Sequence, residues 1–214
     1  MNYFHSVRAW HIIHGVSWLI DKLQMDALLK AASTLTPTSS KKKQWLPWTT
    51  EFILAILAQF QPTDPLHITV EGCLLMVFFT TACLGEFTIP MLKSFDTSRH
   101  IKPSDIFMDT DRNGLKSTGF HLPVTKSGGP EDVLFSAQTG RINPESALQR
   151  HLAINNPPMN SPLFAYIVSS SHHGLMKCKK CKFLEVTTKA TKAVGLNPLQ
   201  GHGIQIGATI EYLL

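Results

Sequence analysis

The pattern of apolar and polar residues divides the chain near its first polar stretch. From Val7 to Leu29, apolar residues return every three or four positions, which places them on one face of a helix. This face comprises Trp10, Ile13, Val16, Ile20, Leu23 and Ala27. Residues 34–44 follow with a proline, serines and three lysines, a composition typical of a linker. We therefore predict a helix over 7–29 and a domain boundary in the linker.

Capping residues predict the next two helices. Thr49 or Thr50 can cap one helix, and Asp64, followed by a proline, can cap a second. The second helix is expected to end near Gly85. Its apolar part, 72–85, is shorter than the stretch of about 20 residues that a bilayer-spanning helix needs. We interpret it as a buried helix.

Short apolar runs in the middle of the chain predict strands. They lie at 105–109, 115–122 and 132–136, and an Asn113-Gly114 pair between the first two is typical of a hairpin turn. We expect a small antiparallel sheet of three strands. Helices then return, with Asn143 as a cap for a helix running to about Ile154. Two more are expected over 183–194 and 206–213.

The composition is that of a folded protein. The 214 residues are 43% hydrophobic and 16% charged, which gives enough apolar material for a packed core and excludes intrinsic disorder. This length suits one domain, or one domain with a fragment of another. The first residues lack a basic segment followed by an apolar one, so we expect no secretory signal and a protein that stays inside the cell.

The positive charge is concentrated at two places. The formal net charge of +5 matters less than the position of the lysines. These lie at Lys41, Lys42 and Lys43, and at Lys177, Lys179, Lys180, Lys182, Lys189 and Lys192. Such clusters attract phosphate oxygens in a way that weakens with salt. A solvated helix face is the alternative, and the two clusters together favour nucleic acid.

The cysteines give a weak metal signal. Cys178 and Cys181 have the spacing of half a zinc site, but no second cysteine pair or spaced histidine pair follows them. Inert or redox-sensitive thiols on a lysine-rich helix are the favoured alternative. Asp109, Asp111 and Asn113 resemble a calcium loop only in part, because Leu122 occupies the position of the bidentate glutamate. We therefore interpret these three residues as part of a turn. We expect neither a metal nor a cofactor.

Several segments together resemble the catalytic domain of tyrosine recombinases, and most closely the phage-integrase-like recombinases of fungal mobile elements. The segments are Thr81–Phe87, Phe120–Lys126, Asn155–Pro158, Pro162–Tyr166, Leu199–Gly207 and Thr209–Leu213. The resemblance covers about 45–214, and 1–40 resemble the end of the helical, SAM-like core-binding domain that precedes it. It implies an α+β fold, mostly helical, with a small antiparallel sheet.

The resemblance also implies which residues occupy the catalytic positions. In this family a tyrosine attacks a DNA phosphodiester, two arginines bind its nonbridging oxygens, and a lysine and a histidine assist proton transfer. Cys83 stands at the first arginine position, and Glu86 keeps the acid of that motif. Lys126 matches the hairpin lysine. His202 matches the histidine, and Gln205 stands at the second arginine position.

The replacement of both arginines, by Cys83 and Gln205, predicts a DNA-binding protein that does not cleave DNA. The position of the nucleophile would lie beyond Leu214, and Tyr212 stands too near His202 to be that residue, so we interpret it as a packed helix residue. The resemblance implies double-stranded DNA and further recombinase protomers as partners, no membrane, a nuclear location and a role in DNA recombination or integration. The alternatives are a non-enzymatic interaction or regulatory module, with a metal on Cys178 and Cys181 as one variant of it, and a degenerate mobile-element relic. Without the resemblance, Lys126 would be interpreted as a solvated turn lysine and His202 as a capping or core histidine.

Overall fold

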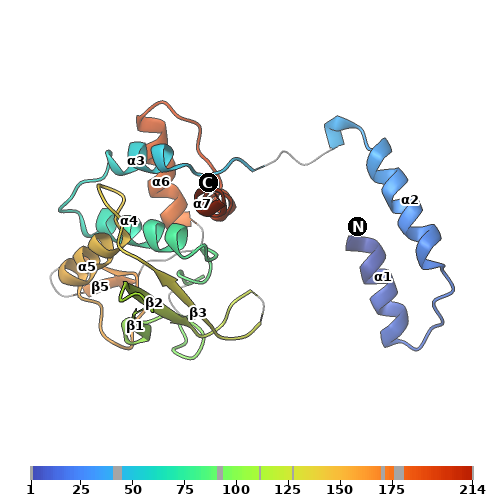
Figure 1. The fold of residues 1–214 in the computed structure, drawn as a ribbon, viewed down its shortest axis with the longest axis horizontal. Coiled ribbons are helices and arrows are strands. Elements are labelled where there is room, and N and C mark those ends of the chain that lie inside the picture. Colours follow the sequence, from blue (N-terminus) through green and yellow to red (C-terminus); the bar gives the residue numbers. More distant parts are fainter. Residues whose placement is uncertain are drawn as a thin grey trace. The chain divides into compact units, whose positions relative to one another are not determined.

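A computed structural model describes residues 2–40, 45–90, 94–110, 112–126, 128–169, 172–175 and 181–213. The chain divides into two compact units, Met1–Gln44 and Trp45–Leu214 (Figure 1). The assignment of these units to a core-binding and a catalytic domain stays a prediction. No described helix is both long and apolar enough to cross a membrane.

The described residues of the smaller unit form two α-helices where the sequence predicted one. Helix α1 spans Asn2–Ile13 and α2 spans Lys22–Leu35, with a short 3-10 helix, η1, at Thr38–Ser40. A continuous helix over 7–29 is therefore wrong. Gly15 adopts a left-handed backbone angle (φ 65°), and the Asp21 side chain caps α2 by accepting a hydrogen bond from the Gln24 amide at 2.8 Å. The apolar spacing continues through this break, so periodicity alone did not reveal it.

The larger unit is an α+β fold, as predicted. In chain order, its elements are α3 (Thr50–Leu57), α4 (Pro65–Phe79), η3 (Pro103–Asp105), β1 (Ile106–Thr110), β2 (Lys116–Leu122), β3 (Glu131–Phe135), α5 (Pro144–Asn155), β4 (Ala165–Ser169), β5 (His172–Leu175), α6 (Cys181–Ala193) and α7 (His202–Leu213). Thr49, Asp64 and Asn143 cap α3, α4 and α5 with their side chains. These three capping predictions are confirmed.

Helix α4 is the centre of the core (Figure 1). All its residues from Ile68 to Phe79 are buried, and it packs against α5, α6, α7 and β4. It ends at Phe79, six residues before the predicted end near Gly85. Thr81 takes a left-handed backbone conformation (φ 54°), which is uncommon for a β-branched residue. The chain leaves the axis of α4 at this point. The loop that results carries the candidate site.

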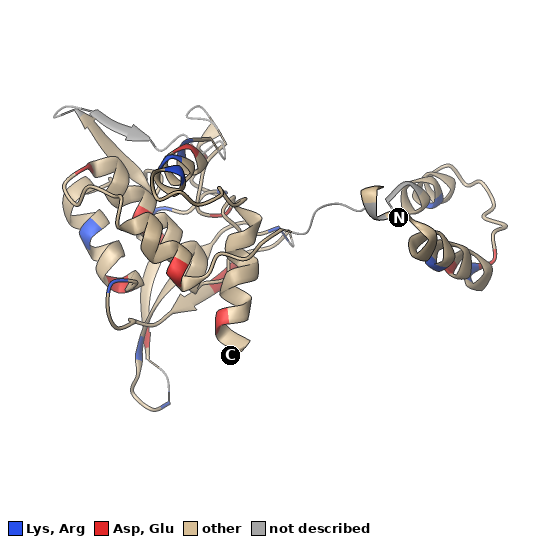
Figure 2. Cartoon of the chain, turned by 90° about the horizontal axis from the view of Figure 1, so that it is seen from above, with Lys and Arg blue, Asp and Glu red and all other residues tan. Residues whose placement is uncertain are grey.

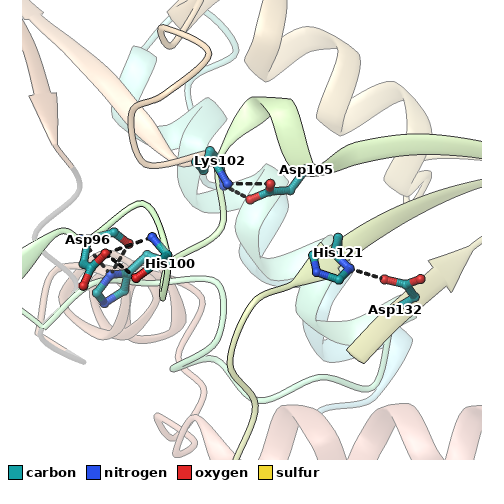
Figure 3. Close-up of polar contacts among 7 residues, drawn as sticks. Asp96, His100, Lys102, Asp105, His121 and Asp132 are labelled. Carbon is teal, nitrogen blue, oxygen red and sulfur yellow. Dashed lines mark hydrogen bonds and ion pairs between the residues drawn. The ribbon is translucent and has the colours of Figure 1, made fainter. Parts of the chain in front are cut away.

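The three predicted strands form one antiparallel sheet in the order β1-β2-β3. His121 of β2 faces Asp132 of β3, and their side chains lie 2.6 Å apart (Figure 3). At the entry to β1, the Lys102 ammonium and the Asp105 carboxylate also lie 2.6 Å apart. A second pair of antiparallel strands, β4 and β5, was not predicted.

A buried carboxylate joins α4 to α5. Glu71 is only 2% exposed, and one of its oxygens contacts the guanidinium groups of both Arg141 and Arg150. The Arg150 contact measures 2.5 Å. A buried carboxylate without such partners would be strongly disfavoured, so the two arginines compensate for its loss of water.

A buried histidine forms a second polar link beside it. His151 is fully buried, and its Nε2 lies 2.8 Å from the Leu163 carbonyl oxygen, so this nitrogen carries the proton. Its Nδ1 lies 3.2 Å from both the Thr69 hydroxyl and the Asn155 amide. Burial lowers the pKa of His151 to about 4, and the hydrogen bond to Leu163 opposes this in part. The network is therefore built for a neutral imidazole.

Candidate functional site

Four of the residues that the resemblance assigned to catalytic positions line one open hollow. Its volume is about 520 Å³, and its walls include Cys83, Glu86, Lys126 and Gln205. Cys83 and Glu86 come from the loop after α4, Lys126 from the β2–β3 connection and Gln205 from α7. Cys83 and Gln205 are 122 positions apart in the chain. The fold thus brings three distant segments to the same place.

Glu86 connects two of these segments. One carboxylate oxygen accepts a hydrogen bond from the Cys83 amide at 2.7 Å, within the loop. The other accepts from the Lys126 amide at 3.1 Å, 40 positions away. Hydrogen bonds to an ionised acceptor are stronger than neutral ones. Glu86 therefore fixes the backbone of Lys126 against the loop, while the Lys126 side chain is left exposed.

Gln205 and Cys83 contact each other where the resemblance placed two arginines. The Gln205 amide nitrogen donates to the Thr81 carbonyl at 3.2 Å, and its oxygen accepts from the Cys83 thiol at 3.7 Å. Burial, followed by the charge of Glu86, raises the pKa of the Cys83 thiol. The thiol therefore stays protonated and neutral at physiological pH. Neither side chain brings a positive charge to the hollow.

His202 and Tyr212 of α7 do not line this hollow among its described residues. The exposed imidazole of His202 lies edge-to-face against the indole of Trp45, with ring centres 4.2 Å apart. The Tyr212 hydroxyl donates to the Phe79 carbonyl at 2.6 Å. Partial burial, followed by the charge of Glu211, raises the pKa of Tyr212. Tyr212 thus has a structural hydrogen bond at the end of α4.

Most of the predicted DNA-binding lysines lie outside the described residues. These are Lys41, Lys42, Lys43, Lys177, Lys179 and Lys180, and Cys178 lies there too. Lys182 is described, and it forms an ion pair with Glu185 at 2.9 Å that raises the pKa of Lys182. Figure 2 marks the basic and acidic positions on the ribbon, and both kinds occur in the described part of the larger unit. Lys189 and Lys192, the other described lysines of the second cluster, are exposed on α6.

The described residues contain no cluster of three or more potential metal ligands. Cys181, the described member of the candidate pair, is exposed at the first residue of α6. A structural zinc site needs four ligands.

Sequence reasoning missed several residues that line the hollow. Thr80 and Thr81 follow α4, Thr125 precedes Lys126, and Glu131 begins β3. The pairing of Glu131 with Leu122 in the β2–β3 register could have indicated its position near the hairpin connection. Thr81 and Thr125 lie in two of the motif segments, but no residue of either motif was assigned to them, and the place of Thr80 depends on the turn at Thr81.

Replacing Glu86 by alanine is expected to destabilise the larger unit by about 2 kcal/mol, because two backbone amides lose a charged acceptor at a partly buried site. Urea denaturation followed by circular dichroism measures this loss. Glu131→Ala is the matched control, since it removes another carboxylate from the same hollow. Equal stability of the two variants would contradict the role given to Glu86.

Comparison with known proteins gives only distant structural likenesses. No family model matches the sequence, and no curated protein matches it. The solved structures that are similar to it include a Flpe–Holliday junction complex (13% identity, TM-score 0.48), an FLP recombinase–Holliday junction complex (15%, 0.49) and a DNA Holliday junction complex of a Flpe point mutant (14%, 0.49).

The matches cover 92%, 93% and 92% of this chain, and 49%, 49% and 50% of the other chains, in the same order. The chain therefore spans about half the length of these recombinases. Because every TM-score is below 0.5, the likenesses carry no inference about function.

Proposed function

We propose that this chain is a double-stranded DNA-binding protein with the site layout of a tyrosine recombinase, and that its site does not cleave DNA. One observation carries the proposal: Cys83, Glu86, Lys126 and Gln205, assigned from three separate motifs, line the same hollow. Motifs that matched by chance would have no reason to converge in space. Descent from a mobile-element recombinase, a role in DNA recombination or integration, a nuclear location and association with other recombinase protomers belong to the same proposal.

Electrostatics favour DNA as the ligand through the two lysine clusters. Lys41–Lys43 are three consecutive positive charges, and Lys177, Lys179 and Lys180 add three within four positions. Each lysine that contacts a phosphate releases condensed counterions, which makes the affinity depend steeply on salt. We therefore expect DNA backbone to be bound at these two clusters.

The two side chains that stand at the arginine positions, Cys83 and Gln205, are neutral, and this is why we expect no cleavage. A charged donor that stabilises a transferring phosphoryl group accelerates the reaction about 10³- to 10⁵-fold. Arginine suits that role because its guanidinium is permanently charged and forms two parallel hydrogen bonds. The Cys83 thiol is protonated, and the Gln205 amide is already engaged with Thr81 and Cys83. Neither can neutralise the charge that develops on phosphate.

A nicked suicide duplex tests the inactivity. Such a duplex traps a covalent protein–DNA link because the released strand end diffuses away. We expect no covalent adduct from the full chain on denaturing gels, with an active tyrosine recombinase and its own duplex as the positive control. An adduct formed by this chain would overturn the argument from Cys83 and Gln205.

The second lysine cluster is expected to set the salt dependence of binding. Replacing Lys177, Lys179 and Lys180 by glutamine should flatten the log–log plot of affinity against salt by about 0.9 for each phosphate that is no longer neutralised, or about 2.7 in all. The control replaces Arg99, Arg112 and Lys116, three exposed residues, by glutamine and removes the same charge elsewhere. Fluorescence anisotropy with a labelled duplex measures both. Equal flattening by the two triple variants would show that only net charge matters.

A further inference from the structure

The segment 45–48, which follows the linker lysines, is attached to the start of α7. The Trp48 amide donates to the Gly203 carbonyl at 3.0 Å, and its indole nitrogen donates to the Gln200 carbonyl at 3.1 Å. Trp48 itself is 1% exposed. The segment and the helix that carries His202 and Gln205 are therefore joined by both backbone and side-chain hydrogen bonds.

Two glycines of α7 permit this close packing. A Cβ at Gly203 would lie 2.3 Å from the Leu46 carbonyl oxygen, and one at Gly207 would lie 1.9 Å from that of Trp48. Both approaches involve backbone atoms, which cannot move aside as a flexible side chain can. Because the two glycines are one helical turn apart, the segment runs along α7 and not merely across it. The register between the segment and the helix is thus fixed at two points.

Trp45 occupies the end of this segment beside His202. Its ring centre lies 4.2 Å from that of the imidazole, at an interplanar angle of 72°. Trp45 is 49% exposed and His202 is also exposed, so this contact is not part of the main core. An exposed histidine at a helix start would otherwise sample several rotamers. The indole restricts the imidazole, while the fixed backbone of 45–48 restricts the indole.

We propose that Trp45 is a positioning residue that holds the imidazole of His202 in one direction for contact with a DNA phosphate. The inference rests on the proposed function for the ligand, but the positioning of His202 can be tested without DNA. Edge-to-face aromatic pairs add a modest stabilisation beyond the area they bury. Fixing the imidazole before binding reduces the entropy lost when DNA binds. Trp45 therefore acts through His202 and needs no contact with DNA of its own.

Three variants of the full chain test the positioning. Trp45→Ala removes the indole, Trp45→Phe keeps an aromatic ring, and Leu46→Ala removes another exposed apolar side chain from the same segment. NMR of the histidine ring protons, assigned with His202→Gln, reports the contact because an adjacent indole shifts them. We expect the His202 resonances to move in Trp45→Ala, to move less in Trp45→Phe and to remain in place in Leu46→Ala.

Duplex affinity provides the functional readout. Removal of the aromatic pair in Trp45→Ala should weaken binding about fivefold, with Trp45→Phe and Leu46→Ala within about twofold of the unmodified chain. Unmoved His202 resonances in Trp45→Ala, or equal weakening by Leu46→Ala, would overturn the inference. If the unmodified chain bound no duplex, the proposed function would fail, and moved resonances would still show that Trp45 contacts His202.

Discussion

Replacing Gly207 by alanine is expected to destabilise the larger unit by about 3 kcal/mol, the upper part of the usual range for overpacking. The added Cβ would lie 1.9 Å from the Trp48 carbonyl oxygen and 2.7 Å from its carbonyl carbon. Either α7 or the segment at Trp48 must therefore move, and both are held by hydrogen bonds between Trp48 and the start of α7. Urea denaturation of the purified chain measures the effect.

The direction of the stability change in Gly207→Ala is a strong test, because helix propensity alone would make this variant more stable. In a helix interior without the close contact, alanine would be more favourable than glycine by about 1 kcal/mol. Gly85→Ala serves as the control, since a Cβ there would have no neighbour within 4 Å. A Gly207→Ala variant as stable as the Gly85→Ala variant, or more stable than the unmodified chain, would contradict the packing of α7 on Trp48.

Acid is expected to remove about 3 kcal/mol of stability through His151. Because burial lowers the pKa of His151 to about 4 in the folded chain, while the unfolded value is about 6.5, the unfolded state binds the proton more readily. The stabilisation is complete above pH 6.5 and is lost as the pH falls toward 4. Between these values the free energy of unfolding should fall by about 1.4 kcal/mol per pH unit.

The useful window for this measurement is pH 7 to 5. The pKa values of Glu51 and Asp96 are lowered by hydrogen bonds, chiefly to Thr49 and Ser98 respectively, so their contributions are lost only at lower pH. His151→Gln, which cannot become charged, should remove the slope over this window. Urea denaturation at pH 7, 6 and 5 measures it. A flat profile in the unmodified chain, or the same slope in the glutamine variant, would refute the role of His151.

Local signals in the sequence were enough to predict most elements of the larger unit. Thr49, Asp64 and Asn143 cap their helices because each side chain reaches amides only two or three residues away. Features that depend on distant partners were missed. Strand β4 is held in part by the Asn155 side chain, whose oxygen accepts from the Ile167 amide at 3.0 Å. Nothing near Ile167 in the sequence indicates that contact.

The candidate site was predictable only in part. From residue spacing alone, Lys126 is interpreted as a turn lysine and His202 as a capping or core residue. Only the motif resemblance groups these two residues with Glu86. The contacts of Gln205 with Thr81 and Cys83 could not be predicted, because they need the left-handed turn at Thr81 that ends α4 early. The clustering of Cys83 and Gln205 is therefore a result of the fold.

The most direct measurement is the affinity of the full chain for a duplex as a function of salt. If the lysine clusters contact DNA backbone, a plot of log affinity against log salt concentration should be linear, with a slope of about −3 or steeper. An uncharged competitor polymer should have no effect on this slope. Binding that does not change between about 50 and 200 mM salt, or no binding at the lower concentration, would contradict the account.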